Sequence, residues 1–173
     1  RVGLAWGAWS CPCVLAVNSV RGSEFAVIGC GGVGLILIQG ARLAVANKII
    51  AVDLMDSKLE MALQFGATHC VSGANGDPVA QVQALAPTLD YAFEAIGLGV
   101  TVQQALAMIR PGGTAVVVGV GMGKVAELPV SDFLQEKKIM GSMYGSGQVH
   151  VDIPRLVDLY MEGKLELDAL ISK

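Results

Sequence analysis

Phe25-Ala-Val-Ile-Gly-Cys-Gly-Gly-Val-Gly34 is the stretch that decides the fold. A short apolar run leads into glycines spaced G-x-G-x-x-G, and a segment with helical periodicity follows at once. We expect a strand, a tight turn at Gly29, and a helix that packs closely on the strand at Gly34. Gly31 removes a side chain at the point where a pyrophosphate would approach the backbone. The N–H groups of the first helical turn would then face the phosphates, and the helix dipole favours their negative charge.

The next apolar run, residues 48–52, ends in an acid. Asp53 follows Gly34 by 19 positions, close to the separation of about 20 residues that is typical of a carboxylate binding the ribose hydroxyls of a dinucleotide. A glycine motif alone is weak evidence, because 22 of the 173 residues are glycine. The glycines and the acid together predict dinucleotide binding. Because a carboxylate repels a 2′-phosphate, they favour NAD over NADP.

The alternation of strand and helix continues along the chain. Further apolar runs at residues 68–71, 89–97, 114–119 and 138–144 alternate with segments of helical periodicity. This pattern predicts an α/β fold, a Rossmann-type doubly wound parallel sheet of about six strands with helices on both faces. Ligands of such sheets bind at the carboxyl ends of the strands.

Two details of the helices can be predicted from single residues. Asp56 follows the strand that ends at Asp53, and its short carboxylate side chain is typical of an N-cap. A helix is expected over residues 151–161, with Pro154 in its first turn, where a proline costs no hydrogen bond.

Composition excludes several classes of protein. The chain is 53% apolar and 16% charged, with a formal net charge of −3. No basic surface for nucleic acid is expected from this balance. A notable uncharged run, residues 25–41, contains five glycines and fits a buried strand and helix better than a membrane span. With four cysteines and no recognisable secretory leader over residues 1–20, a reduced, cytoplasmic location is predicted.

Cysteine and histidine spacing gives little support for a metal site. Cys11 and Cys13 form a Cys-x-Cys pair, but there is no second pair, and His69 and His150 are distant in sequence. A structural zinc site needs four ligands, usually with longer spacers. The sequence therefore predicts neither a metal ligand nor a catalytic residue in this chain, and the two histidines are better explained as surface or strand-end residues.

The chain resembles the coenzyme-binding domain of the zinc-dependent medium-chain alcohol dehydrogenases. It is most similar to the branch that includes glutathione-dependent formaldehyde dehydrogenase. The resemblance covers residues 23–173 and depends on several segments in combination. These are Gly29-Cys-Gly-Gly-Val-Gly34, Ala51-Val-Asp-Leu-Met-Asp-Ser-Lys58, Phe65-Gly-Ala-Thr-His69, Phe93-Glu-Ala-Ile-Gly97, Arg110-Pro-Gly-Gly113, Val116-Val-Val-Gly-Val120 and Lys138-Ile-Met-Gly-Ser-Met-Tyr-Gly145.

The resemblance implies that Asp53 binds the adenosine ribose of NAD and that Lys58 supports the same end of the cofactor. The other implied contacts lie at the glycine turn, in the cofactor cleft and beside the nicotinamide: Gly29, Gly31, Gly32, Val33 and Gly34; Ala95 and Ile96; Val118, Gly119, Val120 and the backbones of Ser142 and Tyr144. Without the resemblance, Lys58 can also be explained as a solvated lysine on the surface of a helix. Ala95, Ile96, Val118 and Tyr144 can also be explained by ordinary packing at the end of a sheet.

In the family, a catalytic domain with the zinc ligands precedes this segment. The resemblance therefore implies that residues 1–22 are a remnant of the junction to that domain and that residues 23–173 are the NAD-binding domain. Whether Cys11 or Cys13 is a remnant zinc ligand stays open. The implied parent protein transfers a hydride between a small-molecule alcohol or aldehyde and NAD, with zinc that this chain does not bind. A homodimer through the edge of the sheet is also implied, with residues 125–130 and 139–144 at the contact.

Other functions are weighed against this one. The chain could be an isolated NAD-binding and dimerising module without catalysis, or part of a zinc-free quinone reductase of the same superfamily. An ATP-using adenylating enzyme would follow its second-strand acid with asparagine and arginine, and residues 52–58 contain neither. A methyltransferase would prefer glycine in place of Val33.

Overall fold

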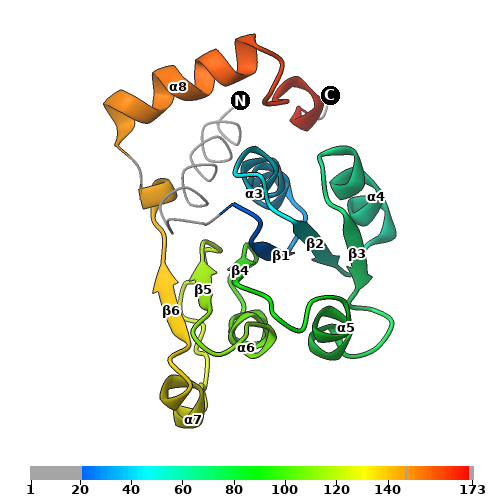
Figure 1. Ribbon diagram of the computed structural model, residues 1–173, viewed down its shortest axis with the longest axis vertical. Helices are drawn as coiled ribbons and strands as arrows, with labels where there is room; N and C mark the ends of the chain where they lie inside the picture. The colour runs from blue at the N-terminus through cyan, green and yellow to red at the C-terminus, as the bar shows by residue number, and fades with distance from the viewer. Residues whose placement is uncertain (1–20, 147, 172–173) are drawn as a thin grey trace.

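The computed structural model describes residues 21–146 and 148–171, and in these ranges it forms one six-stranded parallel sheet covered by helices (Figure 1). The strands are β1 (Glu24–Ile28), β2 (Lys48–Asp53), β3 (His69–Ser72), β4 (Tyr91–Glu94), β5 (Thr114–Val117) and β6 (Lys138–Gly141). Their order in the sheet is β3-β2-β1-β4-β5-β6. The order reverses beside β1, because the chain first adds β2 and β3 on one side and then crosses to β4. The predicted Rossmann-type fold is confirmed.

The register brings the strand ends to one edge. Ile28 of β1 is paired with Val52 of β2 and with Glu94 of β4, and Glu94 is paired with Val117 of β5. Val117 is in turn paired with Gly141 of β6. We call the loops that leave these strand ends the carboxyl rim. The rim contains the position at which a doubly wound sheet binds its ligand.

The described helices are α3 (Gly32–Leu43), α4 (Asp56–Gln64), α5 (Pro78–Leu85), α6 (Gly99–Met108), α7 (Val130–Leu134) and α8 (Val149–Met161), with 3₁₀ turns η1 (Tyr144–Ser146) and η2 (Asp168–Leu170). Helices α3 and α4 cover one face of the sheet, and α5 and α6 cover the other (Figure 1). None of the helices in residues 21–146 and 148–171 combines the length and the apolar character that crossing a membrane requires.

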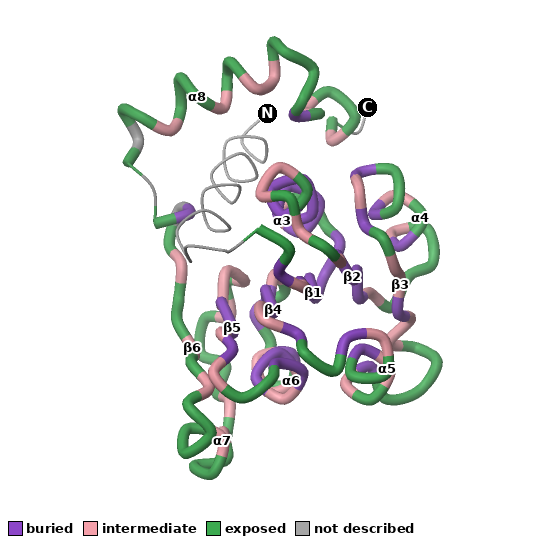
Figure 2. Tube along the Cα trace, in the orientation of Figure 1, coloured by how far each residue is buried: buried purple, intermediate pink, exposed green. Residues whose placement is uncertain are grey.

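The alternation of side chains along β1 divides the core into two parts. Phe25 and Val27 pack with α3 and α4, whereas Ala26 and Ile28 pack with α5 and α6. All four side chains are buried. Figure 2 shows β1, β2 and β4 and the helix faces toward them as mostly buried, while β6, α7 and α8 are mostly exposed.

The ends of two helices differ from the prediction. Met55, not Asp56, is the N-cap of α4, and no side chain caps that helix. The helix begins one residue earlier because the Met55 carbonyl accepts hydrogen bonds from the Lys58 and Leu59 N–H groups at 3.0 and 3.2 Å. The Met55 N–H donates to Oδ1 of Asp53 at 3.0 Å. Helix α8 starts before residue 151, so Pro154 lies inside it. Its additional first turn is stabilised by Asp152, which accepts a hydrogen bond from the Gln148 N–H at 2.6 Å.

The C-terminal segment returns to α3. The fully buried side chain of Gln39 donates to the Glu166 carbonyl at 3.0 Å and accepts from the Glu166 N–H at 2.7 Å. Arg42, one turn further along α3, donates to the Lys164 carbonyl at 2.9 Å. Leu165 between these contacts is buried. Residues that are 127 positions apart in sequence are thereby joined.

Candidate functional site

The glycine turn lies at the carboxyl rim and has the shape that its sequence predicts. Gly29 has a φ of +94°, a conformation that favours glycine, and its N–H donates to the Val52 carbonyl at 2.8 Å. A Cβ atom at Gly34 would overlap the carbonyl oxygen of Gly29, so α3 can lie this close to β1 only without a side chain there. At Gly31 and Gly32, by contrast, a Cβ atom would meet no other atom within 4 Å. The space above these two residues is open.

The N-terminus of α3 faces this open space without a cap. Its N-cap residue, Gly31, makes no side-chain hydrogen bond, and the first turn contains no acid. The Gly31 carbonyl accepts the hydrogen bond of the Leu35 N–H at 2.9 Å. The N–H groups of the first turn are directed away from the helix, as at any α-helix N-terminus, and the helix dipole adds positive potential. The chemistry of this end suits a phosphate group.

Asp53 is fixed beside the turn. Its Oδ2 atom accepts a hydrogen bond from the Cys30 N–H at 2.8 Å, and its Oδ1 atom accepts the one from Met55. The side chain is half-buried. Each carboxylate oxygen has two lone pairs. Both oxygens can therefore accept a further hydrogen bond from a hydroxyl group, and their position relative to the turn is set before any ligand arrives.

Cys30 is inside the turn but is not a reactive thiol. Burial raises its pKa from 9.0 to about 12, and the negative charges of Asp53 and of Cys70 act in the same direction. The hydrogen bond to the Val52 carbonyl and the positive charge of Lys58 on α4 lower the pKa of this thiol in part. The sulfur lies 3.8 Å from the Val52 carbonyl oxygen. At neutral pH Cys30 contributes its backbone N–H to the site and not a thiolate.

The predicted residues after β4 and β5 form an apolar wall of the rim. The Ala95 N–H donates to the Ile28 carbonyl at 2.9 Å, so the loop after β4 stays next to β1. Ile96 lies over the glycine turn, because a Cβ atom at Gly29 would be 2.5 Å from its Cγ1 atom. Ile96 is 42% exposed and Val120 is 70% exposed. Val118 and Gly119 begin the loop after β5 and are half-buried.

Ser142 and Tyr144 follow β6, on the opposite side of β1 from Asp53. The Ser142 N–H donates to the Val117 carbonyl at 2.9 Å. The resemblance implies that this backbone holds a carboxamide, and an N–H engaged in strand pairing would have to exchange its partner to do so. The Ser142 hydroxyl lies 3.0 Å from that of Ser146. Tyr144 begins η1, at the same rim.

One residue of the rim was missed by the sequence reasoning. Glu94 is completely buried at the end of β4, and its carboxylate holds the loop that contains Ile96. The signal was present, because a charged residue ends an otherwise apolar strand and is followed by Gly97. That position is typical of a buried polar group with a specific set of hydrogen bonds.

The described residues do not fit a zinc ion. Among them, no group of three or more histidine, cysteine, aspartate or glutamate side chains is placed to hold a metal. Cys11 and Cys13 lie outside the described residues. We therefore derive no chemical step of this chain from zinc.

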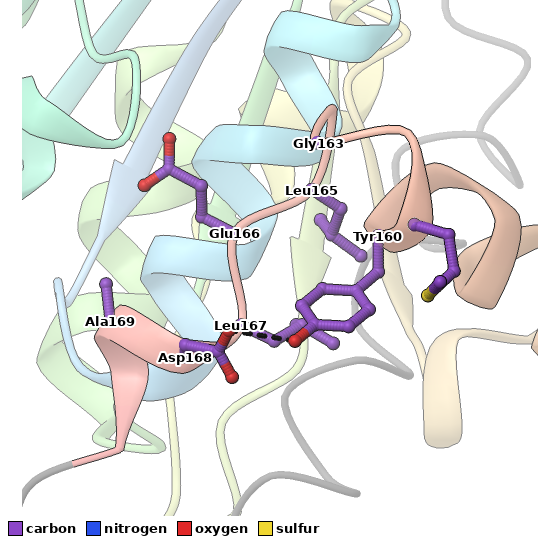
Figure 3. Close-up of a pocket in the computed structure, with 8 residues that line it drawn as sticks. Tyr160, Gly163, Leu165, Glu166, Leu167, Asp168 and Ala169 are labelled. Carbon is purple, nitrogen blue, oxygen red and sulfur yellow. Dashed lines mark hydrogen bonds between the residues drawn. The ribbon is translucent and has the colours of Figure 1, made fainter.

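A pocket lies away from the rim, where the C-terminal segment meets the second half of α3 (Figure 3). Its volume is about 460 Å³, and it is lined by Tyr160, Met161, Gly163, Leu165, Glu166, Leu167, Asp168 and Ala169. The Tyr160 hydroxyl donates to Asp168 at 2.8 Å. Two acids and no base line this pocket, so a diphosphate is better placed at the uncapped helix end than here.

Comparison with known proteins identifies relatives of this chain. The model of the zinc-binding dehydrogenase family matches residues 32–162. S-(hydroxymethyl)glutathione dehydrogenase of Paracoccus denitrificans is 35% identical over 162 residues, which cover 87% of this chain and 43% of that protein.

Two solved structures are similar as well. Benzyl alcohol dehydrogenase from Acinetobacter calcoaceticus has a TM-score of 0.90 and 35% identity, over 98% of this chain and 47% of that one. A dehydrogenase structure from Sinorhizobium meliloti 1021, bound to NADP, has a TM-score of 0.83 and 31% identity, over 96% of this chain and 50% of that one.

The chain thus spans less than half the length of the curated relatives that it matches. The family model covers most of the described sheet, from the start of α3 to the end of α8. The chain belongs to the zinc-binding dehydrogenase family and corresponds to its coenzyme-binding domain.

Proposed function

We propose that this chain is the NAD-binding part of an oxidoreductase that transfers a hydride between a small-molecule alcohol or aldehyde and NAD. The observation that carries the proposal is the hydrogen bond from the Cys30 N–H to Asp53. This bond holds the carboxylate of Asp53 beside the uncapped N-terminus of α3. The carboxylate would accept hydrogen bonds from hydroxyl groups, and the helix N-terminus beside it would bind a diphosphate. A nicotinamide dinucleotide contains these two groups in adjacent positions.

Each part of the rim would have a separate role toward NAD. The first-turn N–H groups of α3 would bind the diphosphate above Gly31 and Gly32, and Asp53 would accept the hydroxyls of the adenosine ribose. Lys58 would add a positive charge at this end of the cofactor. Because Asp53 repels a 2′-phosphate, NAD is preferred to NADP, although one structural relative binds NADP.

The apolar residues of the rim would serve the nicotinamide end. When bound, NAD would supply the hydride acceptor for oxidation of an alcohol. Ala95, Ile96, Val118 and Val120 would line the cleft and exclude water from it. The residues that bind the alcohol or aldehyde, and the zinc of the parent, would belong to parts of the parent protein other than these.

Isothermal titration of the chain with NAD, NADP and ATP tests the proposal. We expect one NAD per chain, weaker binding of NADP and weaker binding of ATP. Equal affinity for NAD and ATP would show that the site does not recognise a dinucleotide and would favour an ATP-using enzyme. NADP binding tighter than NAD binding would contradict the role of Asp53.

Catalysis is proposed for the parent protein and not for this chain alone. A second candidate function is therefore an isolated NAD-binding and dimerising module, favoured by the outer edge of β6 in the described sheet. If this chain formed NADH from alcohols when zinc was added, the interpretation as a module without catalysis would be contradicted. If the parent is instead a zinc-free quinone reductase, the full-length parent protein should reduce quinones without added zinc.

A homodimer through β6 is proposed as well. In the described sheet β6 pairs only with β5, so its outer edge presents unpaired backbone groups. Exposed apolar side chains lie nearby, among them Leu134 and Met140. The N–H groups of Lys138 and Ser142 point toward β5, and strand alternation directs that of Gly141 outward.

Gly141 offers a matched pair of variants for this edge, because a Cβ atom there would meet nothing within 4 Å. Gly141→Pro removes the outward N–H and should convert the dimer to a monomer in light-scattering chromatography. Gly141→Ala keeps the N–H and should stay dimeric. A dimer that tolerates both changes would have to use another surface.

A further inference from the structure

We propose that Glu94 is a positioning residue of the cofactor cleft, which sets the place of Ile96 above the glycine turn without touching the cofactor itself. The inference rests on the proposed NAD site and adds a residue to it. Three contacts of one carboxylate oxygen support it, together with the close packing of the loops that leave β1, β4 and β5.

The first observation is the set of hydrogen bonds to Oε1 of Glu94. This atom accepts from the Ile96 N–H at 2.8 Å, from the Gly97 N–H at 2.7 Å and from the Thr101 hydroxyl at 2.7 Å. Gly97 has a φ of +91°. A loop in this conformation directs two successive N–H groups to one point, and Oε1 of Glu94 lies at that point.

The second observation is that the same loop is enclosed by its neighbours. The Glu94 carbonyl accepts from the Val118 N–H at 2.8 Å and from the Gly119 N–H at 2.9 Å. A Cβ atom at Gly119 or at Gly121 would overlap the backbone of Gly97. The loops after β4 and β5 are therefore in backbone contact, and the Gly97 loop can move only if Gly119 and Gly121 move with it.

The third observation connects this loop to the phosphate turn. The side chain of Ile96 lies so close to Gly29 that a Cβ atom there would be 2.5 Å from it. The Ile96 N–H is one of the groups that Glu94 holds. A displacement of the loop would therefore change the wall of the cleft directly above the turn, and small displacements of a binding surface are costly.

The burial of the carboxylate indicates that this geometry is specific. Glu94 is 0% exposed, and its Oε2 atom has no hydrogen-bond partner among the described residues. Burying a carboxyl group with one oxygen unpartnered is unfavourable, and an apolar side chain would cost less if only packing were required. The compensating contacts are those of Oε1, and all three belong to the loop and to the first turn of α6.

Two substitutions of Glu94 separate the acceptor from the side-chain volume. Glu94→Gln keeps an acceptor oxygen for the loop N–H groups, whereas Glu94→Met has a similar length and no comparable acceptor. We expect the glutamine variant to bind NAD within about threefold of the wild type and the methionine variant to bind about tenfold more weakly or worse. Amide hydrogen exchange at Ile96 and Gly97, measured without cofactor, should be fast only in the methionine variant.

Gln39→Leu is the control for general destabilisation. Gln39 is also a buried polar side chain with two hydrogen bonds, but these join α3 to Glu166, away from the Gly97 loop. This variant should lose thermal stability and keep both its NAD affinity and its slow exchange at Ile96 and Gly97. If Glu94→Met does not fold, Thr101→Val removes one of the three hydrogen bonds and should give a several-fold loss of affinity with faster exchange at Gly97.

The inference is overturned if Glu94→Met, or Thr101→Val in its place, keeps wild-type affinity and exchange. It is also overturned if Gln39→Leu weakens NAD binding as much as Glu94→Met does. A wild-type chain that binds no NAD would contradict the proposed function instead. The exchange measurement needs no cofactor and would still decide whether Glu94 holds the loop.

Discussion

The backbone N–H of Cys30 donates a 2.8 Å hydrogen bond to Oδ2 of Asp53, and this bond joins the glycine turn of β1 to the acid that ends β2. The two sequence features that predict dinucleotide binding are therefore one structural unit. A change at either residue should alter the other, because the carboxylate both orients the turn and is oriented by it.

Replacement of Asp53 should separate charge from geometry. Asp53→Asn keeps an oxygen that can accept from Cys30 but removes the charge, and Asp53→Ala removes both. We expect NAD affinity to fall in the alanine variant by about tenfold or more. Both variants should discriminate less against NADP, since the repulsion of its 2′-phosphate is lost. Titration calorimetry with NAD and with NADP measures the two affinities. Asp56→Asn is the control, because Asp56 is exposed in the first turn of α4. Unchanged affinity for both cofactors in the alanine variant would refute the role of Asp53.

Substitutions at Gly31 and Gly34 should have opposite effects on stability and binding. Gly31→Val places a side chain in open space, so the melting temperature should stay near that of the wild type while NAD binding is lost. Gly34→Ala forces an overlap with the Gly29 carbonyl and should cost about 1–3 kcal/mol of stability. Thermal melting and NAD titration of both variants test this contrast. Normal NAD binding by the Gly31 variant would show that the diphosphate lies elsewhere.

The raised pKa of Cys30 predicts a pH dependence. A thiol that titrates near 9.0 in the unfolded chain and at about 12 in the folded one stabilises the fold fully below pH 9. This contribution is lost as the pH rises from about 9 to 12, because the unfolded state then releases the proton first.

Alkylation by iodoacetamide, located by peptide mass spectrometry, should leave Cys30 unmodified at pH 8 in the folded protein and modify it in guanidinium. In thermal melts, Cys30→Ala should lose less stability than the wild type between pH 9 and 11. Rapid labelling of Cys30 in the folded chain would contradict its burial.

Gln39 should matter for stability more than its neighbour Arg42. Gln39→Leu removes both hydrogen bonds that the fully buried Gln39 amide makes with the Glu166 backbone and should cost about 1–3 kcal/mol. Arg42→Ala removes a hydrogen bond to Lys164 from an exposed side chain and should cost less than about 1 kcal/mol. Denaturant unfolding of both variants gives the comparison. Equal losses would mean that the C-terminal segment is held mainly by Leu165 and not by the Gln39 amide.

Local prediction worked where the physical cause is local. The apolar run before Gly29 and the conformational demand on that glycine lie within a few residues, so strand and turn could be predicted without a structure. The start of α5 is equally local, because the Asp77 carboxylate accepts from the Val79 N–H at 2.9 Å. The N-cap at Asp56 was wrong because the helix begins one residue earlier, where the Met55 carbonyl accepts from the Lys58 and Leu59 N–H groups. The start of the helix depends on the direction in which the chain leaves the strand end.

The sequence by itself determined the α/β class, the glycine turn and the acid of the second strand, since periodicity and spacing along the chain encode them. Only the tertiary structure decided which groups meet. Glu94 holds Ile96 next to the turn of a different strand, Cys30 meets Asp53 across 23 positions, and Gln39 meets Glu166 across 127. These contacts follow from strand order and register, and the pattern of a segment does not specify which segment will lie beside it.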